Sequence, residues 1–291
     1  MLHIVRPWEQ IDNDVLTVFY ADCAAHDGIL AVPPPPFSEL IDQLSVRTVC
    51  LTTEGGTICA AGYARVGETT ATLFGAVHPT WRKRGLGRAL IAALEDAAQR
   101  PMLHVRSEAL HPDAERLFAA CGYRKDFSEF WLRRDLIAPI PRFEPLLVET
   151  WTMRNASRFF ETYVAAFSTR PRGTTDADAS GWIAEYDSDP DFRPELSYLA
   201  MMEGRDAAFV TTFAGSPHPD TGYIGQIGTH PDFRRRGIAQ RLLGLVMARF
   251  AVKHVPALDI HVGEDNPEAI RVYEGVGFVR QGRRGRYIKT P

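Results

Sequence analysis

HPTWRKRGLGR, at residues 78–88, is written a second time as HPDFRRRGIAQ at residues 230–240. The second copy follows the first by 152 residues at every matched position. Each copy is basic, contains glycine, follows a strand-like run and precedes a helix with apolar periodicity. Such a helix N-terminus is suited to bind a diphosphate, because its first backbone N–H groups lack intrahelical partners and attract anions. The repeat predicts two homologous domains, each with a phosphate-binding turn.

Composition narrows the class of protein. The chain has 291 residues, 45% of them hydrophobic and 24% charged, and a net charge of −3, which argues against a general nucleic-acid binder. It has no apolar run of about 18 residues and no secretory leader pattern, so we expect a cytoplasmic protein without a membrane partner. The four cysteines show no CxxC spacing and the nine histidines no metal-ligand spacing, so we expect reduced thiols and no metal.

The order of elements is the same in the two halves. Strand-like runs at 48–52, 57–64 and 71–77 lead into the first turn, and runs at 198–202, 207–213 and 223–229 lead into the second. Each turn is followed by a helix, a strand, a second helix and a closing pair of strands, in the second half through Ile288. We expect an α/β fold of the α+β type with a mixed sheet in each half. The domains are placed at 1–137 and 148–291, with a proline-rich linker at 138–147.

A second motif is also repeated. NPEAIRVYEGVGF at 266–278 matches HPDAERLFAACGY at 111–123, with an offset of 155 residues. Together, Arg82-x-x-Gly85-x-Gly87, Arg234-x-x-Gly237-x-Ala239 and these helices resemble the acyl-CoA signatures of the GCN5-related N-acetyltransferase (GNAT) family. The resemblance covers the core of both halves and implies two tandem GNAT domains that use acetyl-CoA as co-substrate.

The resemblance also implies which residues bind acetyl-CoA. In the second half these are Ile227, Gly228, Thr229, Arg234, Arg235, Arg236, Gly237, Ile238, Ala239, Gln240, Asn266 and Tyr273. In the first half they are Val77, Arg82, Lys83, Arg84, Gly85, Leu86, Gly87 and Arg88. The arginines could add charge-assisted contacts to the diphosphate.

The two halves differ where chemistry would take place. A tyrosine at the position of Tyr273 often protonates the departing CoA thiolate in this family, whereas the first half has Phe118 there and His111 in place of Asn266. We therefore expect the second half to be catalytic and the first to be degenerate in chemistry. The strand 223–229 should splay to admit acyl-CoA, and Gly225 and Gly228 are compatible with a bulge or a close ligand approach.

The general base is less clear from the sequence. Many family members carry a glutamate on this strand, where Tyr223 and Gln226 stand here. His261 has a suitable intrinsic pKa and is our candidate, although it could equally be a partly exposed strand histidine. Glu264 and Asp265 could act through water instead.

The acceptor is expected to be a small-molecule primary amine. Trp182, Tyr186, Asp187, Asp189 and Asp191 could form an aromatic and acidic surface for a cationic amine, or simply a solvated loop. The tandem architecture resembles that of mycothiol synthase, which acetylates the cysteinyl amine of a pseudo-disaccharide thiol precursor. An aminoglycoside-type acetyltransferase and a CoA-binding sensor or scaffold without turnover remain alternatives, as do a monomer and a homodimer.

Overall fold

The structure, a computed structural model, describes residues 4–7, 11–28, 45–168, 178–215 and 220–291. It divides into two compact units, each of which is described by itself. Unit 1 contains residues 1–130 and 282–291, and unit 2 contains residues 131–281. The units are therefore not the two halves of the sequence, because the last ten residues of the chain belong to unit 1.

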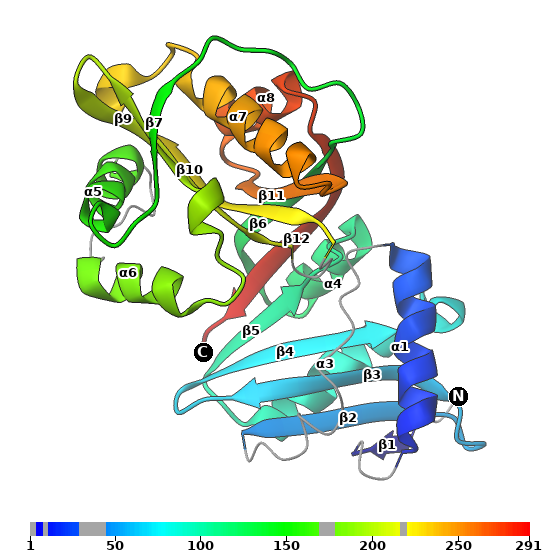
Figure 1. The fold of residues 1–291 in the computed structure, drawn as a ribbon. Helices are drawn as coiled ribbons and strands as arrows, with labels where there is room; N and C mark the ends of the chain where they lie inside the picture. Colours follow the sequence, from blue (N-terminus) through cyan, green and yellow to red (C-terminus); the bar gives the residue numbers. More distant parts are fainter. Residues whose placement is uncertain (1–3, 8–10, 29–44, 169–177, 216–219) are drawn as a thin grey trace. The chain divides into compact units, whose positions relative to one another are not determined.

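Unit 1 is a mixed sheet with helices on both faces (Figure 1). Its strands lie in the order β1-β2-β3-β4-β5-β12-β6, with β4 and β5 parallel and the pairs from β1 to β4 antiparallel. In chain order its elements are β1 (Ile4–Arg6), α1 (Asn13–Asp27), β2 (Val46–Thr52), β3 (Ile58–Val66), β4 (Thr70–Val77), the 3-10 turn Pro79–Trp81, α3 (Leu86–Ala98), β5 (Met102–Ser107), α4 (Pro112–Ala120), the start of β6 (Arg124–Asp135) and the end of β12 (Val279–Lys289).

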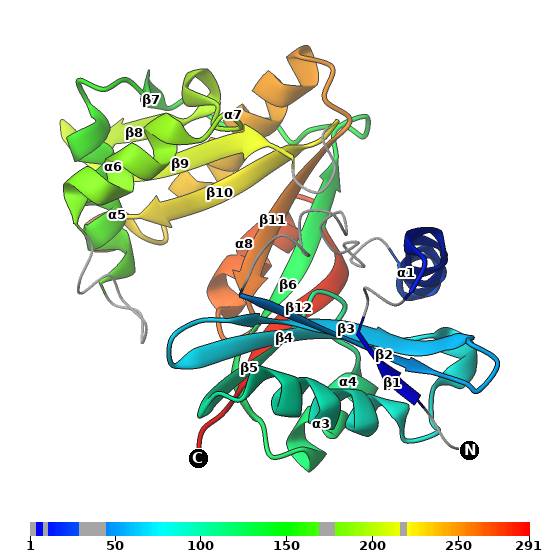
Figure 2. The ribbon, with the colours of Figure 1, turned by 90° about the horizontal axis from the view of Figure 1, so that it is seen from below.

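The core of unit 1 has two layers because successive side chains of a strand point to opposite faces. Val49 and Leu51 of β2 pack with Leu90 and Leu94 of α3, whereas Cys50 packs on the other face with residues of α1. Figure 2 shows α1 and α3 on opposite faces of this sheet. The amphipathic pattern after the first repeated turn therefore forms the helix that the sequence predicts.

Unit 2 repeats this architecture. Its strands lie in the order β6-β11-β10-β9-β8-β7, with β10 and β11 parallel and the pairs from β7 to β10 antiparallel. Its elements are the end of β6, then β7 (Leu147–Thr150), α5 (Ala156–Phe167), α6 (Ala179–Ser188), the 3-10 turn Pro194–Leu196, β8 (Tyr198–Met202), β9 (Arg205–Ala214), β10 (Gly222–Thr229), the 3-10 turn Pro231–Phe233, α7 (Ile238–Val252), β11 (Ala257–Gly263), α8 (Pro267–Gly275) and the start of β12 (Val279–Lys289).

Two helices cover opposite faces of the β10 strand. A Cβ atom on Gly222 would meet the ring of Phe250 in α7 at 2.4 Å, and one on Gly228 would meet the Cβ atom of Ala166 in α5 at 2.7 Å. Both glycines are therefore packing residues. The helix–strand contacts leave no room for a side chain at either position.

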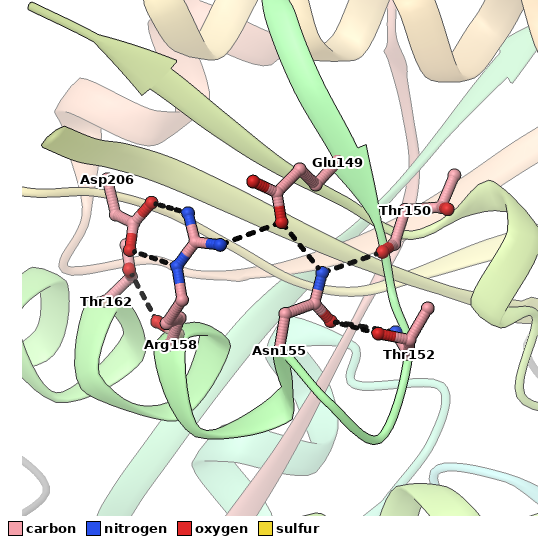
Figure 3. Close-up of polar contacts among 7 residues, drawn as sticks. All are labelled: Glu149, Thr150, Thr152, Asn155, Arg158, Thr162 and Asp206. Carbon is pink, nitrogen blue, oxygen red and sulfur yellow. Dashed lines mark hydrogen bonds and ion pairs between the residues drawn. The ribbon is translucent and has the colours of Figure 1, made fainter. Parts of the chain in front are cut away.

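A polar network fixes the beginning of α5 (Figure 3). Arg158 donates to Glu149 of β7 at 2.8 Å and to both carboxylate oxygens of Asp206 in β9, at 2.9 and 2.5 Å. Asn155 donates to Glu149 and to the carbonyl of Thr150. The hydrogen bonds from Arg158 and Asn155 lower the pKa of Glu149. Through these charged groups the network connects α5 to the strands β7 and β9.

The predicted class, an α/β fold with mixed sheets, is confirmed, and one detail of the prediction is wrong. The closing strands are single: β6 runs unbroken through 124–135 and β12 through 279–289, so neither half ends in a strand pair. Trp182 and Tyr186, for which a solvated loop was one of the two alternatives, lie in the helix α6. The sequence also predicts a helix at 37–44 and a stiff extended segment at 33–36, and both lie outside the described residues.

Candidate functional site

The two repeated turns have the same backbone. His78 and His230 each accept a hydrogen bond on Nδ1 from the N–H two residues later, which caps a 3-10 turn. Lys83 and Arg235 both have a φ of 62°, and Gly85 and Gly237 follow in the left-handed region at 82° and 73°. Helices α3 and α7 begin at the next residue, and neither N-cap glycine supplies a side-chain hydrogen bond. The first-turn N–H groups of both helices are thus arranged as the diphosphate-binding prediction requires.

The first arginine of each turn has a structural partner. Arg82 donates through Nε to the carbonyl of Val77 at 3.0 Å and forms a two-point ion pair with Asp27 of α1. Arg234 donates through Nε to the carbonyl of Thr229 at 3.4 Å and through Nη2 to that of Ala166 in α5. Each arginine therefore connects the end of a central strand to the first helix of its unit.

The third basic residue of each turn stacks on an aromatic ring. The Arg84 guanidinium lies 4.8 Å from the ring centroid of Trp81, and that of Arg236 lies 5.3 Å from the centroid of Phe233. Arg236 also donates to Glu203 at 2.7 Å. These contacts explain why each turn carries an aromatic residue three positions before Arg84 or Arg236.

The middle basic residue distinguishes the two turns. Lys83 forms an ion pair with Asp113 of α4, which also contacts Arg116. Arg235 is exposed and forms no hydrogen bond or ion pair with any residue that the structure describes. A cation that has no protein partner binds an added anion without first breaking an ion pair. The turn of unit 2 is therefore the better prepared of the two to bind a phosphate.

Unit 1 contains a large cavity beside its turn. The cavity has a volume of about 890 Å³. It is lined mainly by residues of α1, β4, the turn, α3, β5 and α4, and among the lining residues are Val77, Lys83, Gly85, Arg88, His111 and Phe118. Its volume is within the usual range for ligand sites. Cys23 also lines it, but burial raises the pKa of this thiol to about 12, so it is not a thiolate nucleophile at neutral pH.

The parallel strands separate next to each turn. In unit 1 the pairing of β4 with β5 extends from Thr70 opposite Met102 to Leu73 opposite Val105. In unit 2 the pairing of β10 with β11 extends from Gly222 opposite Leu258 to Ile224 opposite Ile260. Beyond these residues the two parallel strands of each unit no longer pair with each other. This agrees with the splay predicted for the strand 223–229.

A bulge interrupts β10. Ile224 lies opposite Thr212 of β9 and Gln226 opposite Thr211, so Gly225 is an extra residue, and the Gln226 N–H bonds to the Thr211 side chain at 3.1 Å. The bulge that the sequence suggested is therefore present. The matching strand β4 pairs with β3 over the described residues 71–77 and 60–66 without a register shift. The two units thus differ in the central strand of the site.

The second repeated motif forms α4 in unit 1 and α8 in unit 2. Asn266 caps α8 by accepting from the N–H of Ala269 at 3.2 Å, whereas His111 gives α4 no side-chain cap. Tyr273 is buried, with its ring centroid 6.1 Å from that of Phe278. Phe118 is buried at the matching position and packs on Tyr287 of β12. Hence a phenol in unit 2 is replaced by a phenyl ring in unit 1.

The structure brings together two residues that the sequence analysis considered separately. Nδ1 of His261 in β11 lies 3.1 Å from the hydroxyl oxygen of Tyr223 in β10, and both side chains are half-buried. The neighbouring Asp259 is buried and binds Arg133 of β6 through both oxygens, at 2.8 and 2.7 Å. Asp259 therefore holds β6, while His261 pairs with Tyr223. Nothing in the sequence places Tyr223 beside His261, because the two residues are 38 positions apart on different strands.

The two aromatic residues that were considered for an acceptor surface lie inside the core. Trp182 and Tyr186 of α6 are 8% and 7% exposed and pack with Trp151, and the Tyr186 hydroxyl is 3.3 Å from Thr211 Oγ1. These two rings therefore do not form a surface for an acceptor, because α6 turns them toward the sheet. The acidic residues Asp187, Asp189 and Asp191 are exposed, as a solvated segment would be.

Comparison with known proteins agrees with this architecture. Residues 151–278 match the family described as "Acetyltransferase (GNAT) family", and residues 46–125 match "Acetyltransferase (GNAT) domain". The chain is 30% identical over 279 residues to a mycothiol acetyltransferase of Thermomonospora curvata, covering 88% of this chain and 86% of that one. It is also 30% identical over 245 residues to a mycothiol acetyltransferase of Salinispora arenicola, covering 79% and 78%.

Two solved structures have a similar fold. A GCN5-related N-acetyltransferase from Sphaerobacter thermophilus has a TM-score of 0.72 at 23% identity, covering 99% of this chain and 95% of that one. A tandem GNAT protein from the clavulanic acid biosynthesis pathway has a TM-score of 0.61 at 19% identity, covering 99% and 98%. The chain belongs to the GNAT family of acetyltransferases. It is an N-acetyltransferase with two GNAT domains in tandem, and GNAT acetyltransferases use acetyl-CoA as co-substrate.

The described residues contain no metal-binding cluster, no membrane-spanning helix and no disulfide bond. Among them, no group of three or more His, Cys, Asp or Glu side chains could hold a metal ion. None of the described helices is long and apolar enough to span a membrane. All four cysteines are free thiols.

Proposed function

We propose that the protein transfers an acetyl group from acetyl-CoA to a primary amine of a small molecule, with its active site in unit 2. The observation that supports this proposal best is the bulge at Gly225 in β10, because β4 of unit 1 keeps a regular register. A bulge takes a residue out of the hydrogen-bond ladder and redirects the adjacent backbone groups. A redirected N–H group can donate to the thioester oxygen, which gains negative charge in the transition state.

The reaction is direct attack of the amine nitrogen on the thioester carbonyl carbon. The new C–N bond forms, the C–S bond breaks and the thiolate leaves with the electron pair of that bond. Tyr273, which lies on α8 beside the predicted CoA site, donates its phenolic proton to the thiolate. Phe118 at the same position of unit 1 has no proton to donate, so unit 1 binds acetyl-CoA at its cavity without turnover.

The acceptor we propose is the cysteinyl amine of the mycothiol precursor. The support is that relatives matching most of this chain are named mycothiol acetyltransferases. The exposed carboxylates of Asp187, in the last turn of α6, and of Asp189 and Asp191, just after it, would favour a cationic acceptor.

Matched variants of the repeated turn test the location of the active site. Gly237→Glu and Gly85→Glu place the same anionic side chain at the same positive-φ position of the two turns. Calorimetry with acetyl-CoA should give two sites for wild type and one for each variant. Acetyl transfer to mycothiol lacking its acetyl group should be abolished by Gly237→Glu and should keep most of its rate in Gly85→Glu. The opposite pattern would place the active site in unit 1.

The Tyr273→Phe variant tests the chemistry. We expect a loss in kcat of about 100-fold or more, which is typical of a general acid, with an unchanged affinity for acetyl-CoA. A panel with glucosamine, spermidine and an aminoglycoside tests other acceptors. If wild type acetylates neither mycothiol lacking its acetyl group nor any amine of the panel, the protein is a CoA-binding sensor or scaffold.

A further inference from the structure

We propose that Tyr223 and His261 act together as the general base of unit 2, with Tyr223 taking the proton from the attacking amine while its own proton passes to Nδ1 of His261. This inference rests on the proposed function, because it assigns the proton acceptor of the same reaction. It also replaces the isolated histidine of the sequence analysis by a pair in which the tyrosine contacts the substrate.

The position of the pair supports this role. Tyr223 lies opposite Asp259 in the parallel pairing of β10 with β11, and that pairing ends at the next residue, Ile224. His261 lies two residues beyond Asp259, so its side chain is on the same face of the sheet as Tyr223. The pair therefore stands where the two strands separate and two residues before the bulged Gly225. The thioester must lie in this gap for the bulge to act on it.

The side chains of Tyr223 and His261 contact each other directly. The Tyr223 hydroxyl oxygen is 3.1 Å from His261 Nδ1, and the two ring centroids are 5.6 Å apart. Asp259, the nearest carboxylate along β11, is held by Arg133 and Thr221 rather than by the imidazole. Both rings of the pair are half-buried, so the two residues are not sealed in the core.

The chemistry explains why two residues are needed. A phenol with an ordinary pKa of about 10 does not keep a proton taken from an amine at neutral pH. An imidazole accepts a proton near neutral pH, since its ordinary pKa is about 6.5. In the relay the N–H bond of the attacking nitrogen breaks, a new O–H bond forms on Tyr223, and the former hydroxyl proton binds Nδ1. The histidine ends as imidazolium and the tyrosine is unchanged.

Unit 1 provides a natural comparison. The residue 152 positions before Tyr223 is Ala71, which is 1% exposed and has no polar side chain. The relay is thus confined to the unit that also has the bulge and Tyr273. Three independent differences between the repeats coincide in unit 2.

The test compares Tyr223→Phe, His261→Asn and the double variant in the full-length protein. The acceptor is mycothiol lacking its acetyl group or, if wild type acetylates it faster, an amine of the panel. Each single variant should lower kcat about 100-fold and leave the KM for acetyl-CoA and the Tm unchanged. The double variant should fall no further than the worse single one, because two groups in one relay are not additive. Tyr198→Phe, which removes a hydroxyl bonded to the carbonyl of Glu195, is the matched control and should stay within twofold of wild type.

Rescue separates a catalytic role from a structural one. Imidazole in the buffer should restore transfer by His261→Ala at least tenfold and should not restore transfer by Tyr223→Phe. The relay is overturned if either single variant keeps its kcat within threefold of wild type, or if the losses multiply in the double variant. Absence of transfer by wild type itself would instead overturn the proposed function.

Discussion

Single side chains hold the last strand of the chain in unit 1. Glu115 of α4 accepts hydrogen bonds from Arg283 at 3.1 and 3.2 Å and from the Tyr287 hydroxyl at 2.7 Å, and it pairs with Lys125 at 3.0 Å. The hydrogen bonds from Arg283, with those from Tyr287 and Lys125, lower the pKa of Glu115 to about 2. A carboxylate so placed stabilises the folded state because the unfolded chain lacks these donors.

We therefore predict a pH-dependent loss of stability in Glu115→Gln. The pKa of Glu115 in the folded protein is below its value of about 4.3 in the unfolded chain. The charge of Glu115 therefore stabilises the fold fully above about pH 4.3, and this stabilisation is lost as the pH falls toward 2. At pH 7 the variant should be less stable by on the order of 2 kcal/mol, and the difference should shrink steadily below pH 4. Urea unfolding of both proteins at pH 7, 4 and 3 measures it. A difference independent of pH would mean that packing, not charge, is lost.

Among the secondary-structure elements, the repeated turns were predicted correctly from the sequence, whereas the closing strands were predicted as pairs and are single. The turns are local: a histidine cap, a positive-φ residue and a glycine lie within eight residues, so their geometry is predictable from neighbours in the chain. The closing strands β6 and β12 depend on partners far away in sequence, such as β5 for residues 285–289. Alternation predicts a strand but not its partner, and each half ends in one long strand instead of the expected pair.

Gly228 of β10 allows a test of how closely α5 packs on the sheet. It was expected to allow a close approach of ligand, but a Cβ atom there would lie 2.7 Å from that of Ala166 and 2.8 Å from the Phe209 ring. Gly228→Ala should therefore push α5 away from β10 and destabilise the protein by about 1–3 kcal/mol, as overpacking does. Thermal unfolding measures this effect. Gly55→Ala is the control, because a Cβ atom there meets nothing nearer than 3.8 Å, and its Tm should not fall.

At the scale of the whole molecule, the end of the chain completes the sheet of the unit in which the chain began. β12 pairs with β5 from Gly285 opposite Ser107 to Lys289 opposite Leu103, and the Lys289 ammonium pairs with Glu95 of α3 at 3.0 Å. Residues 131–135 of β6 belong in turn to unit 2, where Arg133 binds Asp259. Each unit thus contains a strand from the other half of the sequence.

This arrangement predicts the effect of a short truncation. Removing residues 282–291 leaves β5 without one neighbour and Glu115 without Arg283 and Tyr287, so unit 1 should lose stability and unit 2 should keep most of it. Hydrogen exchange should show lost protection in β5 and α4 and little change in α7. Removing only Thr290 and Pro291, which lie outside β12, is the control. Equal loss of protection in both units would mean that they unfold as one.

The family, the two tandem domains and the positions of both repeated turns follow from the sequence alone, because these depend on repeated local motifs. It also marked the difference between Tyr273 and Phe118, since chemical identity is read directly from the residue. Only the tertiary structure decided which side chains meet. It placed Tyr223 on His261, turned Trp182 and Tyr186 into the core, and joined the last strand to unit 1, because each of these contacts connects residues whose separation along the chain carries no signal of their proximity.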